Sequence, residues 1–110
     1  MTLLQQMARD RYADCERLRQ ETRRQLRDAL QQCVPVQTVV VFGSLVKPGR
    51  FNPASDLDVA LECEPAGVSV YGLASLLSER LGRRVDLVSL SECRFRETIL
   101  REGERWTLPS

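Results

Sequence analysis

The first third of the chain carries a regular alternation of apolar and polar positions. Across residues 3–33, mainly apolar side chains recur mostly at intervals of three to five positions, close to the period of an α-helix. This stripe consists of Leu4, Met7, Tyr12, Cys15, Leu18, Thr22, Leu26, Ala29, Leu30 and Cys33. The other faces carry many charges, and Pro35 follows, which cannot continue a helix. The pattern predicts one long amphipathic helix, whose stripe we expect to pack on the chain's own sheet.

Three short runs of β-branched and apolar residues are typical of strands. They cover residues 36–42, 57–63 and 84–90. Between the first two runs, residues 47–55 contain two prolines, a glycine and an asparagine, which indicates a loop. Residues 64–67 have the composition of a turn.

Two further helices are predicted in the second half of the chain. Residues 69–81 place leucines on one face, and Gly82 is suited to end such a helix. Ser91 has the character of an N-cap for a final helix over about 92–102. The remaining sequence, GERWTLPS, is expected to be a short tail.

The predicted elements occur in the order helix, strand, strand, helix, strand, helix. This order predicts an α/β (α+β) fold in which helices pack on one face of a sheet. The chain has 110 residues, the size of one small domain. We divide it into an N-terminal helical segment over residues 1–34, a core over residues 35–104 and a C-terminal tail over residues 105–110.

Composition and charge exclude several classes of function. Sixteen basic and fifteen acidic residues nearly balance, which argues against a dedicated nucleic-acid binder. The absence of histidine excludes histidine-based general-base catalysis and the common zinc sites. Four widely spaced cysteines without a signal peptide predict reduced, mostly buried thiols in a cytoplasmic protein. No apolar run is long enough to cross a membrane.

Three aspartates are the candidate catalytic and metal-binding residues. Because side chains alternate along a strand, Asp56 and Asp58 project from the same face, while Leu57 and its alternate neighbours point into a core. Two adjacent carboxylates repel each other unless a cation lies between them, and Mg²⁺ prefers such oxygen ligands. Asp86, isolated among apolar residues of another strand, could complete a two-metal site and help to deprotonate an attacking hydroxyl.

A glycine–serine turn after the first strand is a candidate phosphate site. Gly43 would let the backbone approach a phosphate closely, and Ser44 could add a hydrogen bond. Lys47 and Arg50 follow in the loop as candidate phosphate contacts, and Ser55 is a further candidate nucleotide ligand. Taken singly, a Gly-Ser pair is usually a turn and an Asp-x-Asp pair is common on solvated strands. Their conjunction favours nucleotide chemistry.

The segment GSLVKPGRFNPASDLD resembles the Gly-Ser…Asp-x-Asp signature of the DNA polymerase β-type nucleotidyltransferase superfamily. The short chain and the GRRVDLV strand with its third aspartate are similar to the minimal nucleotidyltransferase branch, and the resemblance covers residues 36–103. It implies a mixed β-sheet with helices on one face and the active site on the other.

The resemblance also implies a mechanism. Gly43 and Ser44 would hold the β- and γ-phosphates of a nucleoside triphosphate such as ATP. Asp56 and Asp58 would bind two Mg²⁺ ions, and Asp86 would ligate one of them and activate the acceptor. The acceptor would attack the α-phosphorus in line, releasing pyrophosphate and retaining a nucleoside monophosphate.

Members of this branch are similar to the antitoxins of type VII toxin–antitoxin systems. The implied partner is a HEPN-type ribonuclease toxin, and the implied reaction adenylylates one of its tyrosines. Two alternatives stay open: a non-catalytic antitoxin that neutralises the toxin by direct binding, and nucleotidyl transfer to a small molecule. A homo-oligomer and a hetero-oligomer with the toxin are both compatible with the sequence.

Overall fold

The computed structural model describes residues 1–34, 38–63 and 67–108. Within these residues the helices are α1 (Leu3–Cys33), α2 (Val70–Leu81) and α3 (Arg96–Glu102). The strands are β1 (Thr38–Phe42), β2 (Leu57–Leu61), β3 (Val85–Ser89) and β4 (Glu104–Thr107). Two short 3₁₀ turns, η1 (Gly43–Val46) and η2 (Leu90–Glu92), follow β1 and β3. Parts of the expected first strand and of the expected turn at 64–67 lie outside the described residues.

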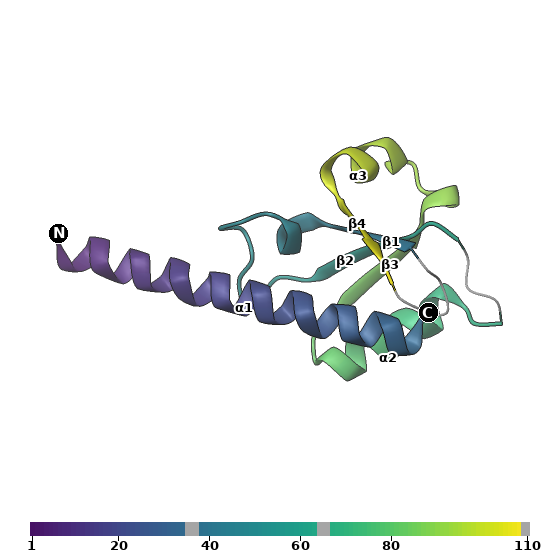
Figure 1. The fold of residues 1–110 in the computed structure, drawn as a ribbon, viewed down its shortest axis with the longest axis horizontal. Coiled ribbons are helices and arrows are strands. Elements are labelled where there is room, and N and C mark those ends of the chain that lie inside the picture. The colour runs from purple at the N-terminus through teal and green to yellow at the C-terminus, as the bar shows by residue number, and fades with distance from the viewer. Residues whose placement is uncertain (35–37, 64–66, 109–110) are drawn as a thin grey trace.

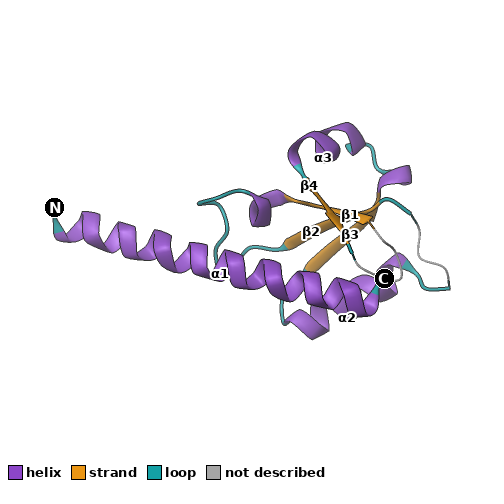
Figure 2. Cartoon of the chain, viewed as in Figure 1, coloured by secondary structure: helices purple, strands orange, loops and turns teal. Residues whose placement is uncertain are grey.

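The strands of the described chain form one mixed sheet in the order β3-β2-β1-β4. β1 pairs antiparallel with both β2 and β4, whereas β2 and β3 are parallel and are connected through α2 (Figure 2). The strand β4 corrects the expectation of an irregular tail after residue 103. Its four residues are too short a run to indicate a strand locally, and the ladder with β1 is what holds them extended.

The helices lie on both faces of the sheet (Figure 1). α1 and α2 cover one face, as expected, and bury Leu26, Leu30, Leu73 and Leu77 against alternate strand residues. The short helix α3 lies on the opposite face, where Ile99 joins a smaller apolar cluster. The expectation that helices pack on one face of the sheet was therefore right for α1 and α2, whereas α3 lies on the other face.

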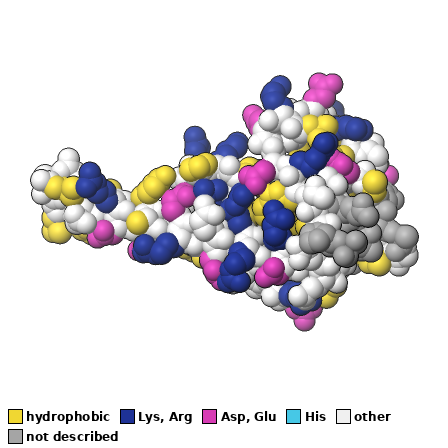
Figure 3. Space-filling view, viewed as in Figure 1, with side chains coloured by type: hydrophobic (Ala, Val, Ile, Leu, Met, Phe, Trp, Pro, Cys, Tyr) yellow, Lys and Arg dark blue, Asp and Glu magenta, His cyan; other side chains and the backbone are white. Residues whose placement is uncertain are grey.

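α1 begins with a capping box and runs without a break to the predicted end. The Thr2 hydroxyl accepts from the Gln5 amide at 3.2 Å, and the Gln5 side chain accepts from the Thr2 amide at 2.9 Å. Only the second half of the helix packs on the sheet, because residues 1–14 are all exposed and project beyond the core. Figure 3 shows this projecting end with hydrophobic and basic side chains on its surface.

α2 has the ends that its sequence predicts. The Ser69 hydroxyl accepts from the Gly72 amide at 2.9 Å, and Gly82 ends the helix in the left-handed conformation with φ 64°. The final helix differs from the prediction. α3 begins at Arg96 and not near residue 92, because Leu90–Glu92 form the 3₁₀ turn η2 and Ser91 hydrogen-bonds Ser89 and caps no helix.

Two smaller expectations can be compared with the structure. All four cysteines are free, but Cys63 is exposed and the others are only partly buried, so the prediction of mostly buried thiols was wrong. Among the described helices, none combines the length and apolar character needed to cross a bilayer.

Candidate active site

The candidate site lies on the sheet face opposite α1 and α2. The strand register places Phe42, Asp58 and Asp86 in one row across β1, β2 and β3. Alternation sends the neighbours Leu57 and Val85 into the main core on the other face. The register therefore places Asp58 and Asp86 side by side on the open face.

Gly43 lies directly against the Asp58 carboxylate. Its φ of 79° is a conformation that side chains other than glycine rarely adopt. A Cβ atom built at this position would lie 3.3 Å from Asp58 Cγ and closer still to Oδ2. The turn η1 can therefore bring its backbone next to the carboxylates only with glycine at position 43.

The carboxylates of the site interact electrostatically. Burial, followed by the nearby charges of Asp86 and Asp56, raises the pKa of Asp58 to about 6. The Arg84 guanidinium opposes this shift and donates to Asp86 Oδ1 at 3.1 Å. Asp56 is exposed and lies in the loop just before β2, and its link to the site is the effect of its charge on Asp58. The three aspartates thus form one electrostatically coupled group.

A cavity of about 410 Å³ opens beside these carboxylates. Its polar lining includes the carboxylates of Asp58 and Asp86, and its apolar lining comes from β1, β3, α3 and the segment that joins η2 to α3. Its lining consists of Phe42, Gly43, Lys47, Asp58, Asp86, Val88, Cys93, Phe95, Thr98, Ile99 and Glu102. Such a combination suits a ligand with a charged end and a flat or apolar end.

Of the other predicted ligands, Ser44 and Ser55 do not line this cavity, whereas Lys47 does. Ser44 is half-buried within η1, where its carbonyl accepts from the Lys47 amide at 3.2 Å. The Ser55 hydroxyl accepts from the Asn52 amide at 3.0 Å, so it contributes to the local turn. Lys47 is exposed and is the predicted cation that does line the cavity.

The loop that leads to Asp56 is held in place by Arg83. One nitrogen of this guanidinium donates to the carbonyls of Pro53 at 3.0 Å and Ser55 at 2.6 Å. The same guanidinium lies 4.8 Å from the ring centroid of Phe51, which is buried. Arg83 therefore links the turn before β3 to the loop before β2, a role that local sequence reasoning did not identify.

The donor set fits a hard divalent cation in its chemistry. Aspartate oxygens with mutual repulsion are suited to Mg²⁺, which takes one or two carboxylates and completes its shell with phosphate oxygens and water. In the described residues, however, no three histidine, cysteine or acidic side chains converge closely enough to hold a metal by themselves.

Sequence reasoning missed most of the apolar wall of the cavity. Val88 lies two residues after Asp86 in β3, so strand alternation alone places both side chains on the same face of the sheet. Phe95, Thr98 and Glu102 come from the segment around α3, and their position depends on α3 lying on the site face. No local pattern indicates which face of a sheet a short helix covers.

Comparison with known protein families identifies the family to which this chain belongs. The family described as polymerase beta, nucleotidyltransferase matches residues 24–106. The chain belongs to this nucleotidyltransferase family. The match includes η1, the Asp-x-Asp strand and the third aspartate, whereas the first two-thirds of α1 lie outside it. No curated protein matches the chain.

Three solved structures are similar to this nucleotidyltransferase domain. A toxin–antitoxin complex with AMP-PNP has 26% identity and a TM-score of 0.59, over 73% of this chain and 68% of that chain. The toxin–antitoxin MntA–HepT has 22% identity and a TM-score of 0.57, over 80% and 72%. A mutant of the toxin–antitoxin MntA–HpeT has 23% identity and a TM-score of 0.55, over 73% and 68%. The last two likenesses show the fold.

Proposed function

We propose that this protein is a Mg²⁺-dependent nucleotidyltransferase that uses ATP to adenylylate a tyrosine of a HEPN-type toxin, and that it acts as the antitoxin of that toxin in the cytoplasm. The observation that carries the proposal is the row formed by Asp58 and Asp86 with Gly43 against it, at the polar side of the cavity. The similar toxin–antitoxin complex with AMP-PNP, an ATP analogue, supports both the nucleotide and the kind of partner.

In this proposal each residue has a role that follows from its position. Gly43 and Ser44 present the η1 backbone to the β- and γ-phosphates, and Lys47 adds a positive charge at the cavity. Ser55 shapes the turn that delivers Asp56. Asp56, Asp58 and Asp86 would hold the two Mg²⁺ ions, which supply charge stabilisation for the transferring phosphoryl group.

The transfer is a single displacement at phosphorus. The tyrosine oxygen forms a bond to the α-phosphorus while the bond from that phosphorus to the bridging oxygen breaks, and pyrophosphate leaves with the bonding electrons. In this proposal Asp86 takes the phenol proton, and its place on the edge strand, half-exposed at the cavity, supports that role. The apolar wall with Phe95 suits the nucleobase or the incoming aromatic ring.

One observation favours a second candidate function. The projecting end of α1 exposes Leu3, Leu4 and Met7, an apolar surface through which the protein would neutralise its toxin by direct binding alone. The two functions differ in what removal of the carboxylates does. A binding antitoxin keeps its protective effect without Asp56 and Asp58, whereas a catalytic one loses it.

The test is transfer of label from α-³²P-ATP to a co-purified toxin partner in the presence of Mg²⁺. We expect labelling by the wild type and none by the variant with both Asp56→Ala and Asp58→Ala. Asp28→Ala, which removes an exposed aspartate of α1, is the matched control and should label normally. Labelling by the double variant would refute the assigned site, and protection of cells by a variant that never labels would establish the binding mechanism.

A further inference from the structure

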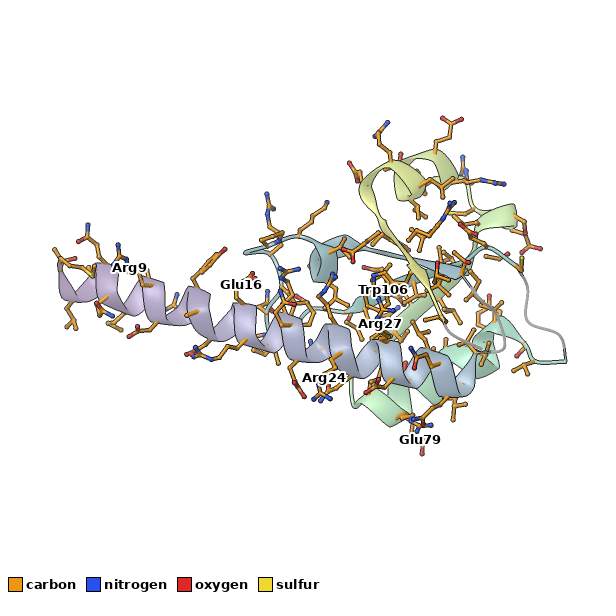
Figure 4. All side chains as sticks on the ribbon, in the orientation of Figure 1. Arg9, Glu16, Arg24, Arg27, Glu79 and Trp106 are labelled. Carbon is orange, nitrogen blue, oxygen red and sulfur yellow. The ribbon has the colours of Figure 1, made fainter. Side chains whose placement is uncertain are left out.

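The segment that joins β1 to the Asp-x-Asp strand is held at two points by α1. Residues 43–50 consist of η1 and the turn after it, and Lys47, which lines the cavity, lies between the two points. The first point is the carbonyl of Leu45, and the second is the amide of Gly49. Both are contacted by charged side chains of one helical turn, Glu16 and Arg19 (Figure 4 labels Glu16).

Arg19 is a buried charge that hydrogen-bonds both this segment and Glu16. The residue is 7% exposed. Its Nη1 donates to the Leu45 carbonyl at 3.0 Å, and its Nε donates to Glu16 Oε2 at 3.1 Å. Because burying an unpaired guanidinium is costly, this arrangement requires both partners. The carbonyl of Leu45 is in this way bonded to a rigid helix.

Glu16 completes the connection at the other end of the segment. Its Oε1 accepts from the Gly49 amide at 2.7 Å. This amide, together with the Arg19 guanidinium, lowers the pKa of Glu16 below its usual value, so the acceptor is charged at neutral pH. Gly49 has a φ of 79°, and a Cβ there would lie 3.2 Å from a ring carbon of Tyr12. The loop thus rests against the helix at a position suited to glycine.

We propose that Glu16 and Arg19 are positioning residues for nucleotide binding, which hold η1 and Lys47 in the shape that receives the triphosphate. This inference rests on the proposed function, because it assumes that the site takes a nucleotide. Both residues precede residue 24, where the family match begins, so the match itself assigns them no role.

The physical reason is the cost of ordering a loop on binding. A short segment without a regular ladder loses conformational freedom when it closes on a ligand, and this loss weakens the affinity. A segment that α1 already holds has lost that freedom beforehand. Removing the contacts should therefore weaken nucleotide binding more than it slows transfer at saturating nucleotide.

The experiment measures AMP-PNP affinity of the full chain by calorimetry in Mg²⁺, together with exchange of the Gly49 amide by NMR without nucleotide. For Arg19→Ala and Glu16→Ala we expect affinity to fall about 10-fold and Gly49 exchange to rise by a similar factor. Glu16→Gln keeps an acceptor for the Gly49 amide and should lose about 3-fold in affinity. In the transfer assay, KM for ATP should rise while kcat changes less than about 3-fold.

The matched control is Arg17→Ala. Arg17 belongs to the same helical turn and forms the same kind of pair, with Asp14 three residues earlier, but it is exposed and, within the described part of the chain, bonds Asp14 and not the segment 43–50. It should leave affinity and Gly49 exchange unchanged. If Arg19→Ala unfolds the chain, Glu16→Ala and Glu16→Gln carry the test, because Glu16 is only partly buried.

The outcomes separate this inference from the proposed function. If the wild type binds AMP-PNP and the Glu16 and Arg19 variants bind it equally well, the positioning role is refuted and the function stands. If the folded wild type binds no nucleotide, the proposed function is refuted and the positioning role with it. A loss of affinity with unchanged Gly49 exchange would also overturn the inference, because the loop would then not be held by these contacts.

Discussion

The two faces of the sheet are built from the same four strands but serve different purposes. On the face toward α1 and α2, alternate residues such as Val59 and Leu61 are fully buried in a large apolar core. On the other face, the apolar cluster around Val40 and Ile99 is small and gives way to Asp58 and Asp86. A shift of one residue along β2 thus separates core from candidate chemistry.

This difference shows how a small domain can hold repelling carboxylates. Burial of the charged Asp58 carboxylate, together with the nearby charges of Asp86 and Asp56, opposes folding at neutral pH, as the raised pKa of Asp58 indicates. The large core on the opposite face supplies the stability that offsets this cost. We therefore expect substitutions on the site face to change activity and those on the packed face to change stability.

The largest expected effect is on transfer activity. Asp58→Ala should lower nucleotidyl transfer on the order of 10³-fold, because it removes the carboxylate nearest to Gly43. Single-turnover kinetics with labelled ATP measures this effect, and circular dichroism should show an unchanged fold. A variant with near-normal activity would show that the site face does not carry the chemistry.

The second effect compares one apolar residue from each face. Leu77→Ala, in α2 on the packed face, should lower the free energy of unfolding by about 3 kcal/mol, because Leu77 is fully buried. Ile99→Ala, in the small cluster under α3, should cost about 2 kcal/mol and also weaken nucleotide binding, because Ile99 lines the cavity. Urea unfolding and calorimetry measure the two quantities. If Leu77→Ala and Ile99→Ala weakened nucleotide binding equally, the division into a packed face and a site face would be wrong.

The third effect tests the close approach at Gly43. Gly43→Ala should destabilise the protein by about 1–2 kcal/mol through backbone strain, and it should also lower transfer activity by displacing Asp58. Gly67→Ala is the matched control, because Gly67 has nearly the same φ of 78° but no neighbour within 4 Å of the added Cβ. The control should share the loss of stability and keep full activity. Loss of activity in both variants would show that strain alone, and not contact with Asp58, is responsible.

The smallest effect concerns pH. Because the folded-state pKa of Asp58 is about 6, above the 3.8 of the unfolded chain, the folded state binds this proton more tightly. In EDTA, the wild type should therefore gain stability from this group as pH falls from 7 toward 4. Asp58→Asn should be more stable than the wild type by about 1 kcal/mol at pH 7, a value reduced for solvent screening, and the difference should shrink by pH 4.5. Urea unfolding at pH 7 and at pH 4.5 measures this difference in the free energy of unfolding, with Asp28→Asn as an exposed control.

Local pattern was sufficient for much of the fold. The stripe from Leu4 to Cys33 predicted α1, and Ser69 and Gly82 marked the ends of α2, because periodicity and caps act within a few residues. β4 and the start of α3 were missed. Glu104–Thr107 are extended because they pair with β1, which lies more than 60 residues earlier in the sequence. Such pairings carry no short-range signal.

The site was predictable to a similar degree. Gly43, Asp58 and Asp86 could be chosen from their residue types and strand alternation, and the structure brings these three together. The roles of Arg83, Arg19 and Glu16 could not be predicted, because each depends on a carbonyl or amide from a distant loop. On the sequence alone, these residues resemble the other charges of solvated surfaces.

The sequence by itself determined the types of most helices and strands, the family and the carboxylates of the candidate site, because these depend on side-chain chemistry and short periods. Tertiary structure decided which face α3 covers, that β4 joins the sheet, and that α1 holds the loop after η1. Each of these depends on contacts between distant segments, whose free energy appears only when the chain has folded and water is excluded from between them.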